Sequence, residues 1–285
     1  MRNEIHRSLF AVLAALALVF LATSPLVAQT VTFNLTNVGS GDPSLDSIYT
    51  SPYTGNINGG PTIPVICDDF ADESFIPEEW TAYVTSLSPT STAVNPILRW
   101  GDSNVVAGTA PTVGSVSSYS WSLTQTHAYD VAALLSIDIL TSVQGSQAQK
   151  DFSYALWGLF DPTDAFAWLN SNGSYTDQSN AETDLNNAIG QVNGAISGGT
   201  LGGILGNYNV TIYSYDPPPS AGGTGMIPMC GSPLVGCAAN GYSLPPQEFI
   251  SVTTPEVSTP VLMAVDLLGF MALVGFLRKR ISRTI

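Results

Sequence analysis

The sequence predicts an α+β protein, with a β-sandwich-like body that carries a helical insertion at about residues 125–197. Three observations lead to this prediction. Apolar and polar residues alternate near both ends of the body, as they do in half-buried strands. Apolar residues recur at helical spacing in its middle. Two further apolar runs flank the body and indicate an N-terminal signal peptide and a C-terminal transmembrane helix.

The composition narrows the class of protein. Of the 285 residues, 45% are hydrophobic and 11% are charged, where about 25% charged residues is usual for a soluble domain. A chain with this much apolar content can bury a core, which argues against disorder. The formal net charge of −14 argues against nucleic acid as a partner, because phosphate binding needs a basic surface.

Residues 1–28 have the features of a secretory signal peptide. Arg2 and Arg7 are positive, an apolar run follows over residues 9–21, and small residues precede the expected cleavage after Ala28. The alternative is an uncleaved membrane anchor, although the apolar runs of signal peptides are usually shorter than spanning helices. Either interpretation exports the chain that follows.

Residues 29–253 are expected to form one exported domain, since no internal repeat is present. Its first half favours β structure, with strands at residues 31–36, 53–57, 62–66 and 81–85. The turn residues Asn58-Gly59-Gly60 join the second and third of these into a hairpin. Residues 101–120 are rich in small polar residues and predict a loop with short strand content.

The middle of the domain favours helices over residues 126–143 and 147–159. Asp161 and Pro162 have the residue types of an N-cap and a first helical position, and so begin a third helix. Ser179 to Glu182 has the pattern of a capping box. The helix that it begins is expected to end at Ile196, before Gly198-Gly199, and strands return at residues 208–215 and 247–253.

The exported body is strongly acidic. The 22 acidic residues include Glu4, Glu256 and Asp266 outside it, so 19 acidic and two basic residues give the body a charge of −17. Such a surface repels anionic polymers and can bind them through divalent cations, which makes an exopolysaccharide a candidate partner. Solubility alone is the simpler interpretation.

The C-terminal apolar run from Pro260 to Leu277 is just long enough to span a bilayer. The basic residues that follow place the C-terminus in the cytoplasm and the body outside. Asp266 lies within the span, where an acidic residue costs about 2.5–3.5 kcal/mol. A tolerated acidic residue and a weakened, transient anchor are the two interpretations of Asp266.

Residues 254–259, Thr-Pro-Glu-Val-Ser-Thr, precede this run. A short Pro-Glu motif, one apolar helix and a basic cluster, in this order over residues 254–285, resemble the PEP-CTERM sorting signal of Gram-negative bacteria. The resemblance implies that an exosortase, a membrane transpeptidase, recognises Pro255 and Glu256. It also implies delivery to the cell envelope or the biofilm matrix. The third motif residue is usually proline in that family, whereas Val257 stands here, which bears on the efficiency of processing.

Three cysteines belong to the exported part. Cys230 and Cys237 lie in a Gly/Pro-rich segment and could form a small disulfide loop in an oxidising compartment. A metal site is not expected there, because no histidine or further cysteine stands nearby. Cys67 is then the odd cysteine.

Two short segments, Val65 to Phe70 and Phe152 to Trp157, carry a second resemblance. They resemble the two signatures of bacterial thioester adhesin domains, in which a strand Cys bonds to a Gln on a helix. Cys67 matches the Cys position, but Ser153 occupies the Gln position, and a hydroxyl group has no acyl carbon to supply. Gln149 lies one turn earlier and could substitute only if the helix shifted its register.

Signals for an enzyme are weak. His127, the one histidine of the body, stands at a helix start as a capping or surface residue would, and no Gly-x-Ser-x-Gly elbow is present. The acidic residues between Asp68 and Glu79 lack the pattern of a glycosidase pair and are expected to form a solvated loop. No cofactor is expected, and calcium bound by this stretch stays an open alternative.

The sequence therefore predicts an exported surface or matrix protein with a non-catalytic structural or adhesive role. A thioester-type covalent adhesin that uses Cys67 and a secreted hydrolase are the alternatives.

Overall fold

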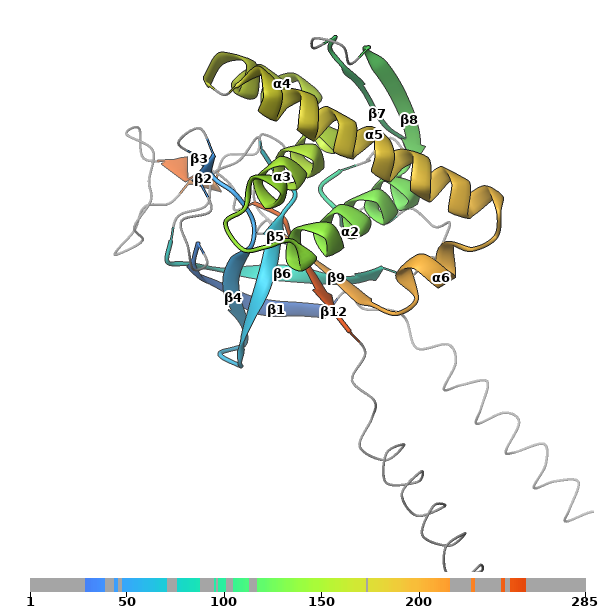
Figure 1. Ribbon diagram of the computed structural model, residues 1–285. Helices are drawn as coiled ribbons and strands as arrows, with labels where there is room; N and C mark the ends of the chain where they lie inside the picture. Colours follow the sequence, from blue (N-terminus) through green and yellow to red (C-terminus); the bar gives the residue numbers. More distant parts are fainter. Residues whose placement is uncertain are drawn as a thin grey trace, which may run out of the picture.

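The computed structural model describes residues 29–38, 44–45, 48–70, 76–87, 95, 97–100, 105–112, 117–172, 174–215, 227–228, 242–243 and 247–254. Six strands form a closed barrel, and the helices lie together on one side of it (Figure 1). The predicted signal peptide, Cys230, Cys237 and the tail from Pro255 onward fall outside these residues. In the part of the chain that is described, no helix combines the length and the apolar character needed to cross a membrane.

The barrel is antiparallel throughout. Its strands follow one another around the barrel in the order β1 (Gln29–Asn37), β4 (Tyr53–Ile57), β5 (Thr62–Cys67), β12 (Phe249–Thr253), β9 (Asn209–Tyr215) and β6 (Glu78–Leu87). The expected β-sandwich is therefore wrong, because β1 pairs with β4 on one edge and with β6 on the other. Alternation predicts one buried face per strand, and both two packed sheets and one closed sheet satisfy it.

Aromatic rings fill the barrel. The ring of Phe33 lies 4.6 Å from that of Trp80, 5.1 Å from that of Tyr213 and 5.4 Å from that of Phe249, measured between centroids. Gly55 on β4 leaves room for this cluster, because a Cβ atom there would lie 3.3 Å from the Phe33 ring and 2.9 Å from the Asn34 carbonyl oxygen. A barrel of this size is a packed core rather than a channel.

The hairpin predicted at residues 53–66 is confirmed as β4 and β5. Asn58 and Gly59 both have positive φ angles, 52° and 69°, as the two central residues of a type I′ turn require. The side-chain oxygen of Asn58 also accepts a 2.9 Å hydrogen bond from the Thr32 backbone N–H, which ties the turn to β1. The other predicted strands correspond to β1, β6, β9 and β12.

Outside the barrel, the described residues form three further two-stranded sheets. The largest pairs β7 (Val105–Ala110) with β8 (Tyr119–Thr124), where a loop with short strand content was expected. Small and polar residues there hide the alternation, which Trp121 and Leu123 on the buried face of β8 reveal. The others pair β2 (Ser44–Leu45) with β3 (Ile48–Tyr49), and β10 (Ile227–Pro228) with β11 (Tyr242–Ser243).

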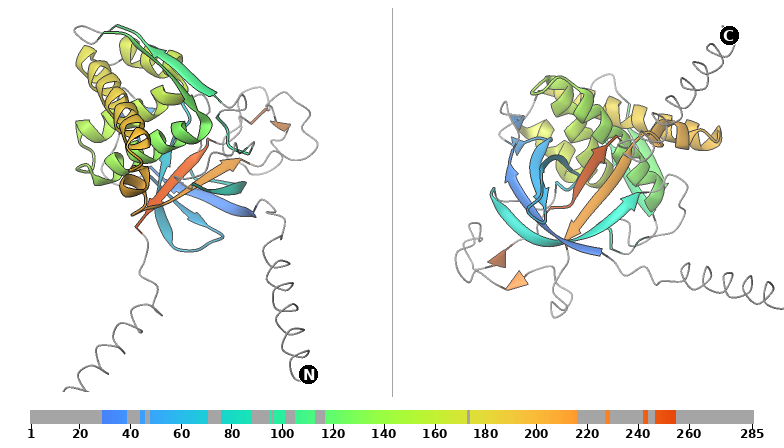
Figure 2. Two further views of the ribbon diagram at one scale, coloured as in Figure 1. Left: turned by 90° about the vertical axis from the view of Figure 1, so that its right-hand side faces the viewer. Right: turned by 90° about the horizontal axis from the view of Figure 1, so that it is seen from below.

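The predicted helical insertion is confirmed between β8 and β9. It consists of α2 (Gln125–Thr141), α3 (Gln147–Phe160), α4 (Pro162–Asn172), α5 (Tyr175–Ser197) and α6 (Leu201–Leu205), of which α6 was not predicted. Helix α2 packs against α3, α5 and strand β12, so it lies between the barrel and the other helices (Figure 2). This central position explains why α2 is buried on nearly all sides.

The start of α5 differs from the prediction. Ser174, not Ser179, is the N-cap: its Oγ accepts from the Asp177 N–H, and the Asp177 carboxylate accepts from the Ser174 N–H, both at 3.2 Å. Both positions have capping-box residues, and the earlier one prevails because Glu182 is needed inside the helical layer, where it is fully buried. The helix ends at Ser197, one residue after the predicted Ile196, and Gly198 is its C-cap.

Candidate functional site

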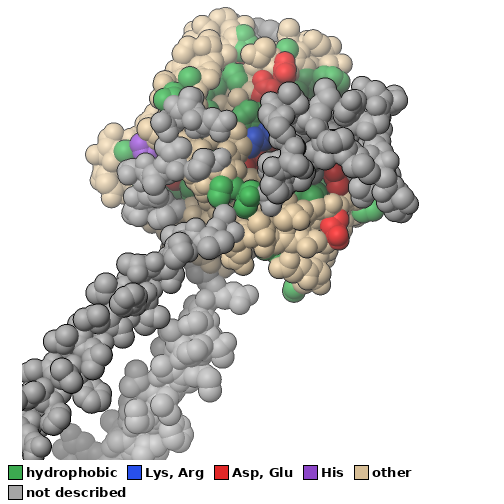
Figure 3. All heavy atoms as spheres, turned by 180° about the vertical axis from the view of Figure 1, so that it is seen from behind, with side chains coloured by type: hydrophobic (Ala, Val, Ile, Leu, Met, Phe, Trp, Pro, Cys, Tyr) green, Lys and Arg blue, Asp and Glu red, His purple; other side chains and the backbone are tan. Residues whose placement is uncertain are grey.

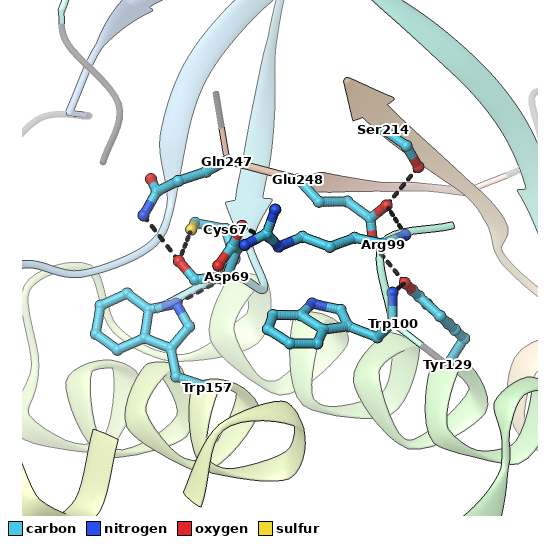
Figure 4. A network of polar contacts seen from close by, with 9 residues as sticks. All are labelled: Cys67, Asp69, Arg99, Trp100, Tyr129, Trp157, Ser214, Gln247 and Glu248. Carbon is cyan, nitrogen blue, oxygen red and sulfur yellow. Dashed lines mark hydrogen bonds and ion pairs between the residues drawn. The ribbon is translucent and has the colours of Figure 1, made fainter. Parts of the chain in front are cut away.

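Cys67 lies at the end of β5, where the barrel meets α3. Its side chain is fully buried. Its backbone N–H donates to Ser51 Oγ at 2.9 Å, and its carbonyl oxygen accepts from Trp157 Nε1 at 3.0 Å (Figure 4). The two segments that carry the thioester resemblance therefore lie side by side, joined through the Trp157 indole.

Ser153, at the position that Gln occupies in the thioester domains, has a structural role. It is fully buried, and its Oγ lies 3.0 Å from the Gln149 carbonyl oxygen and 3.5 Å from that of Ser51. Ser51 thus contacts both Ser153 and the Cys67 backbone. The site brings these three residues together without an amide side chain at position 153.

Gln149 is a structural residue of the α2–α3 connection. Its Nε2 donates to the Ile139 carbonyl oxygen at 2.9 Å, and its Oε1 accepts from the Gly145 N–H at 2.8 Å. Both ends of the amide are therefore used to hold the end of α2 against the start of α3. A register shift that released Gln149 would leave the buried Ile139 carbonyl oxygen unpaired, at a cost of about 1–3 kcal/mol, and would also free the half-buried Gly145 N–H.

Gln247, in contrast, converges on Cys67. Cys67 Sγ donates to the Asp69 carbonyl oxygen at 3.1 Å, and Gln247 Nε2 donates to the same oxygen at 2.7 Å (Figure 4). The strand register explains this, because Cys67 pairs with Phe249 and so has Gln247 diagonally opposite. The sequence analysis placed Gln247 at the start of a strand and gave it no chemical role.

Asp72 and Glu73 of the acidic stretch lie outside the described residues, and the described acids do not form the solvated loop that was expected. Asp68 and Asp69 are fully buried, whereas Glu79 on β6 is exposed and Glu78 is half-buried. Burial follows from tertiary pairing: the Asp68 N–H donates to the Glu248 carbonyl oxygen at 3.4 Å, which extends the β5–β12 ladder past Cys67. Among the described residues, no group of three or more His, Cys, Asp or Glu side chains is arranged to hold a metal ion.

A polar network surrounds these acids. Arg99 Nε forms a 2.6 Å ion pair with the Asp69 carboxylate. Glu248 accepts from the Tyr129 hydroxyl at 2.5 Å on one oxygen, and from the Ser214 hydroxyl and the Arg99 backbone N–H on the other (Figure 4). The network thus joins β9 and β12 of the barrel to helix α2 and to the segment of residues 97–100.

Burial controls the chemistry of the thiol. It raises the pKa of Cys67 well above its usual value, and the negative charge of Asp69 raises it further. The group is therefore a neutral thiol at neutral pH, and the thiol is a much weaker nucleophile than the thiolate. Burial and the neighbouring Glu248 also raise the pKa of Tyr129, which keeps its hydroxyl group as a donor.

His127 lies in the first turn of α2, as the sequence analysis expected. It is half-buried, and its backbone N–H donates to the N-cap oxygen, Thr124 Oγ1, at 3.3 Å. A groove of about 650 Å³ opens between the β7–β8 hairpin and the start of α4. Neither His127 nor Cys67 belongs to the lining of that groove, so it does not bring them to a common surface.

Several residues of the network were missed by the sequence analysis. One signal was present for Arg99, which is one of two basic residues in an acidic body and would be expected to pair with an acid. A weaker signal was present for Glu248, a charged residue directly before an apolar strand. Tyr129 and Ser214 carry no signal, because helical and alternating patterns also account for them.

The surface is poor in positive charge. On the face shown in Figure 3, uncharged polar groups and backbone dominate, with scattered acidic groups and a small basic spot.

Asp130 and Asp184 in the helical layer have pKa values raised to about 7, chiefly because burial penalises the charged carboxylate.

No protein-family model matches the sequence, and no curated protein matches it. Two solved structures from Streptococcus pyogenes are weakly similar. The N-terminal thioester domain of the fibronectin-binding protein SfbI has 10% identity and a TM-score of 0.37, over 80% of this chain and 95% of that one. The N-terminal domain of the pilus tip adhesin Cpa has 11% identity and a TM-score of 0.36, over 81% and 97%. Both are domains of bacterial surface adhesins, and at this level of similarity no residue role is transferred from them.

Proposed function

We propose that the chain is an exported surface or extracellular-matrix protein with a structural or adhesive role and no catalytic activity. The observation that carries the proposal is the state of the Cys67 site. The thiol is buried and neutral, Ser153 donates to backbone, and Gln149 holds the α2–α3 connection. The side chains that the sequence offered for covalent chemistry are thus used for packing.

Export and sorting complete the proposal. The N-terminal segment directs the chain out of the cytoplasm, and an exosortase-like transpeptidase recognises Pro255 and Glu256. The C-terminal helix holds the chain in the membrane at least until that step. The body, with its charge of −17, then faces the envelope or the polymer matrix, where it binds exopolysaccharide.

Intact mass spectrometry of the protein from its native host tests this. The expected mass corresponds to a chain that begins near Gln29 and ends near Pro255. A P255A/E256A variant is the matched control and is expected to keep its C-terminal helix. A wild-type protein that also keeps this helix would mean a simple membrane anchor and would overturn the sorting step.

Polymer binding is tested with exopolysaccharide from the same host, in the presence and absence of a chelator. An anionic polymer is expected to bind only with divalent cations, because the body repels it directly. Binding that persists unchanged in chelator would assign the contact to uncharged groups of the polymer. No binding under either condition would remove the polymer as a partner.

One observation favours a second candidate, a covalent adhesin. Cys67 Sγ and Gln247 Nε2 share the Asp69 carbonyl oxygen as acceptor, so a rotation of either side chain brings the Gln247 amide carbon toward the sulfur. The sulfur would attack that carbon and ammonia would leave, forming a thioester. An external amine would then displace the sulfur, forming an amide and releasing the thiol.

The same mass spectrum distinguishes the two candidates. A thioester lowers the mass by about 17 Da, the mass of the ammonia lost. C67A and Q247E variants would abolish that loss, and a loss that survives either substitution would implicate other residues. A wild-type mass that does not show this loss would exclude the covalent adhesin, and only the non-covalent role would remain.

A further inference from the structure

Asp68 and Glu248 form an enclosed carboxyl pair. Their exposed fractions are 0% and 1%, and they lie opposite each other, with the Asp68 N–H bonded to the Glu248 carbonyl oxygen. Side chains directly opposite each other on an antiparallel pair lie on the same face, and in the described residues both carboxyl oxygens of Asp68 are buried without a hydrogen-bond partner. Ionised carboxylates are acceptors only, so the two carboxyl groups can share a hydrogen bond only while one of them carries a proton.

The surrounding donors decide where the proton sits. Glu248 accepts from three groups: the hydroxyls of Tyr129 and Ser214, and the Arg99 backbone N–H. Within the described part of the chain, no donor group reaches either carboxyl oxygen of Asp68. Because hydrogen bonds from donors favour the ionised form of a carboxyl group, Glu248 is the anion and Asp68 holds the proton.

We propose that this pair is a proton-dependent clasp: protonated Asp68 donates to ionised Glu248 and fastens β5 to β12, and loss of the proton loosens the junction between the barrel and helix α2. Tyr129 connects the clasp to α2, and Ser214 connects it to β9. Without the proton, two adjacent buried carboxylates would repel each other.

The other groups that face the pair do not relieve this repulsion. In the described residues they are Asp69 and Cys67 at the end of β5, Tyr129 on α2, and Arg99. Arg99 is the one cation among them and already pairs with Asp69. Ionised Asp68 would therefore add a buried charge without a partner, which costs several kcal/mol in proteins generally.

The direction of the pH dependence follows. Burial, and then the charges of Glu248 and Asp69, raise the pKa of Asp68 well above its usual value. A group whose pKa is raised on folding contributes its stability fully below its unfolded pKa, about 3.9 for Asp. That contribution is lost as the pH rises through the folded pKa, so the clasp holds in acid and weakens toward alkaline pH.

The test is the unfolding equilibrium of the full-length protein from pH 5 to pH 9, for wild type and Asp68→Asn. Asparagine can still donate to Glu248 but cannot ionise. Because the folded wild type holds the Asp68 proton and the unfolded chain releases it, each increase of one pH unit raises the wild-type unfolding constant by up to about tenfold. Asp68→Asn is expected to lack this component. The free energy of unfolding of the variant, relative to that of the wild type, should therefore increase as the pH rises. Glu79→Gln removes one exposed carboxyl group of β6 as the matched control, and should run parallel to the wild type.

An Asp68→Asn curve that runs parallel to the wild type throughout would overturn the clasp. Should that variant not fold, hydrogen exchange of the wild type decides. After correction for intrinsic exchange, the Asp68 and β12 amides should lose protection as the pH rises, while those between β1 and β6 keep theirs. Equal loss in both places would show general destabilisation and no clasp.

Discussion

The barrel interior and the helical layer are stabilised by different means. The barrel is filled by the packed rings of Phe33, Trp80, Tyr213 and Phe249. The helical layer also buries polar side chains, among them Gln125, Asp130, Gln149, Asp151, Gln178 and Glu182. Apolar contacts do not titrate, whereas buried carboxyl groups destabilise the fold once they ionise. The pH sensitivity of the domain is therefore expected in the helical layer and in the Asp68–Glu248 pair at its junction with the barrel, and not in the aromatic interior.

The largest expected effect lies in the barrel. Phe33→Ala should lower the free energy of unfolding by about 3–5 kcal/mol, because it removes the ring that contacts three other aromatic residues. Urea unfolding of the full-length protein measures this. Val143→Ala, at a side chain that is 78% exposed, is the control and should change stability by about 0.5 kcal/mol or less. Equal effects of the two would mean that the ring cluster does not stabilise the barrel.

The next effect lies in the polar part of the helical layer. Gln149→Ala leaves the Ile139 carbonyl oxygen and the Gly145 N–H without their partner. The expected loss is about 1–3 kcal/mol in the same unfolding assay, the cost of one orphaned buried group, because the Ile139 carbonyl oxygen is buried and the Gly145 N–H is half-buried. Gln191→Ala, at an exposed position of α5, should be nearly neutral. If Gln149→Ala lowered the free energy of unfolding no more than Gln191→Ala, Gln149 would have no structural role.

The pH dependence of the melting temperature tests the buried carboxyl groups of the helical layer. Asp130 and Asp184 have folded pKa values of about 7, so their contribution is complete below about pH 4 and is lost as the pH rises toward and past 7. The Tm should therefore fall from pH 5 to pH 8. The D130N/D184N variant should flatten this decline, whereas Glu79→Gln should leave it unchanged. A decline of unaltered steepness in the double variant would place the pH sensitivity elsewhere.

The smallest effect concerns the start of α5. Ser174→Ala removes the side chain that caps the helix and should cost about 1 kcal/mol. Ser179→Ala lies inside the helix and should be neutral or slightly stabilising, because alanine is the better helix former. Thermal unfolding of both variants compares the two capping-box patterns. A larger loss of stability for Ser179→Ala than for Ser174→Ala would instead support the predicted start of the helix at Ser179.

The two halves also differ in how far the sequence revealed them. The β4–β5 hairpin was predictable, because Asn58 and Gly59 are turn residues whatever surrounds them. The helices were predictable from spacing and caps, with α5 misplaced because two capping patterns compete. Short strand content was expected at residues 101–120, but the β7–β8 pairing was not, and α6 was missed, since small residues give no periodic signal.

The candidate site was only partly predictable. Cys67 and the Phe152–Trp157 segment were singled out through their resemblance to the thioester signatures, and the structure places them side by side. The burial of Asp68 and Asp69 was not foreseen, because it depends on a strand far along the chain: 178 residues separate Asp69 from its partner Gln247. Alternating patterns do not say which distant strand will lie alongside.

By itself the sequence determined the acidic character of the body, the turn at Asn58-Gly59, the helical insertion and the absence of an acyl donor at position 153. Only the tertiary structure decided that the sheet closes into a barrel, that Asp68 faces Glu248, and that Gln247 converges on Cys67. The physical reason is range. Turn and cap preferences act over a few residues, whereas strand pairing and burial depend on groups that meet only in the folded chain.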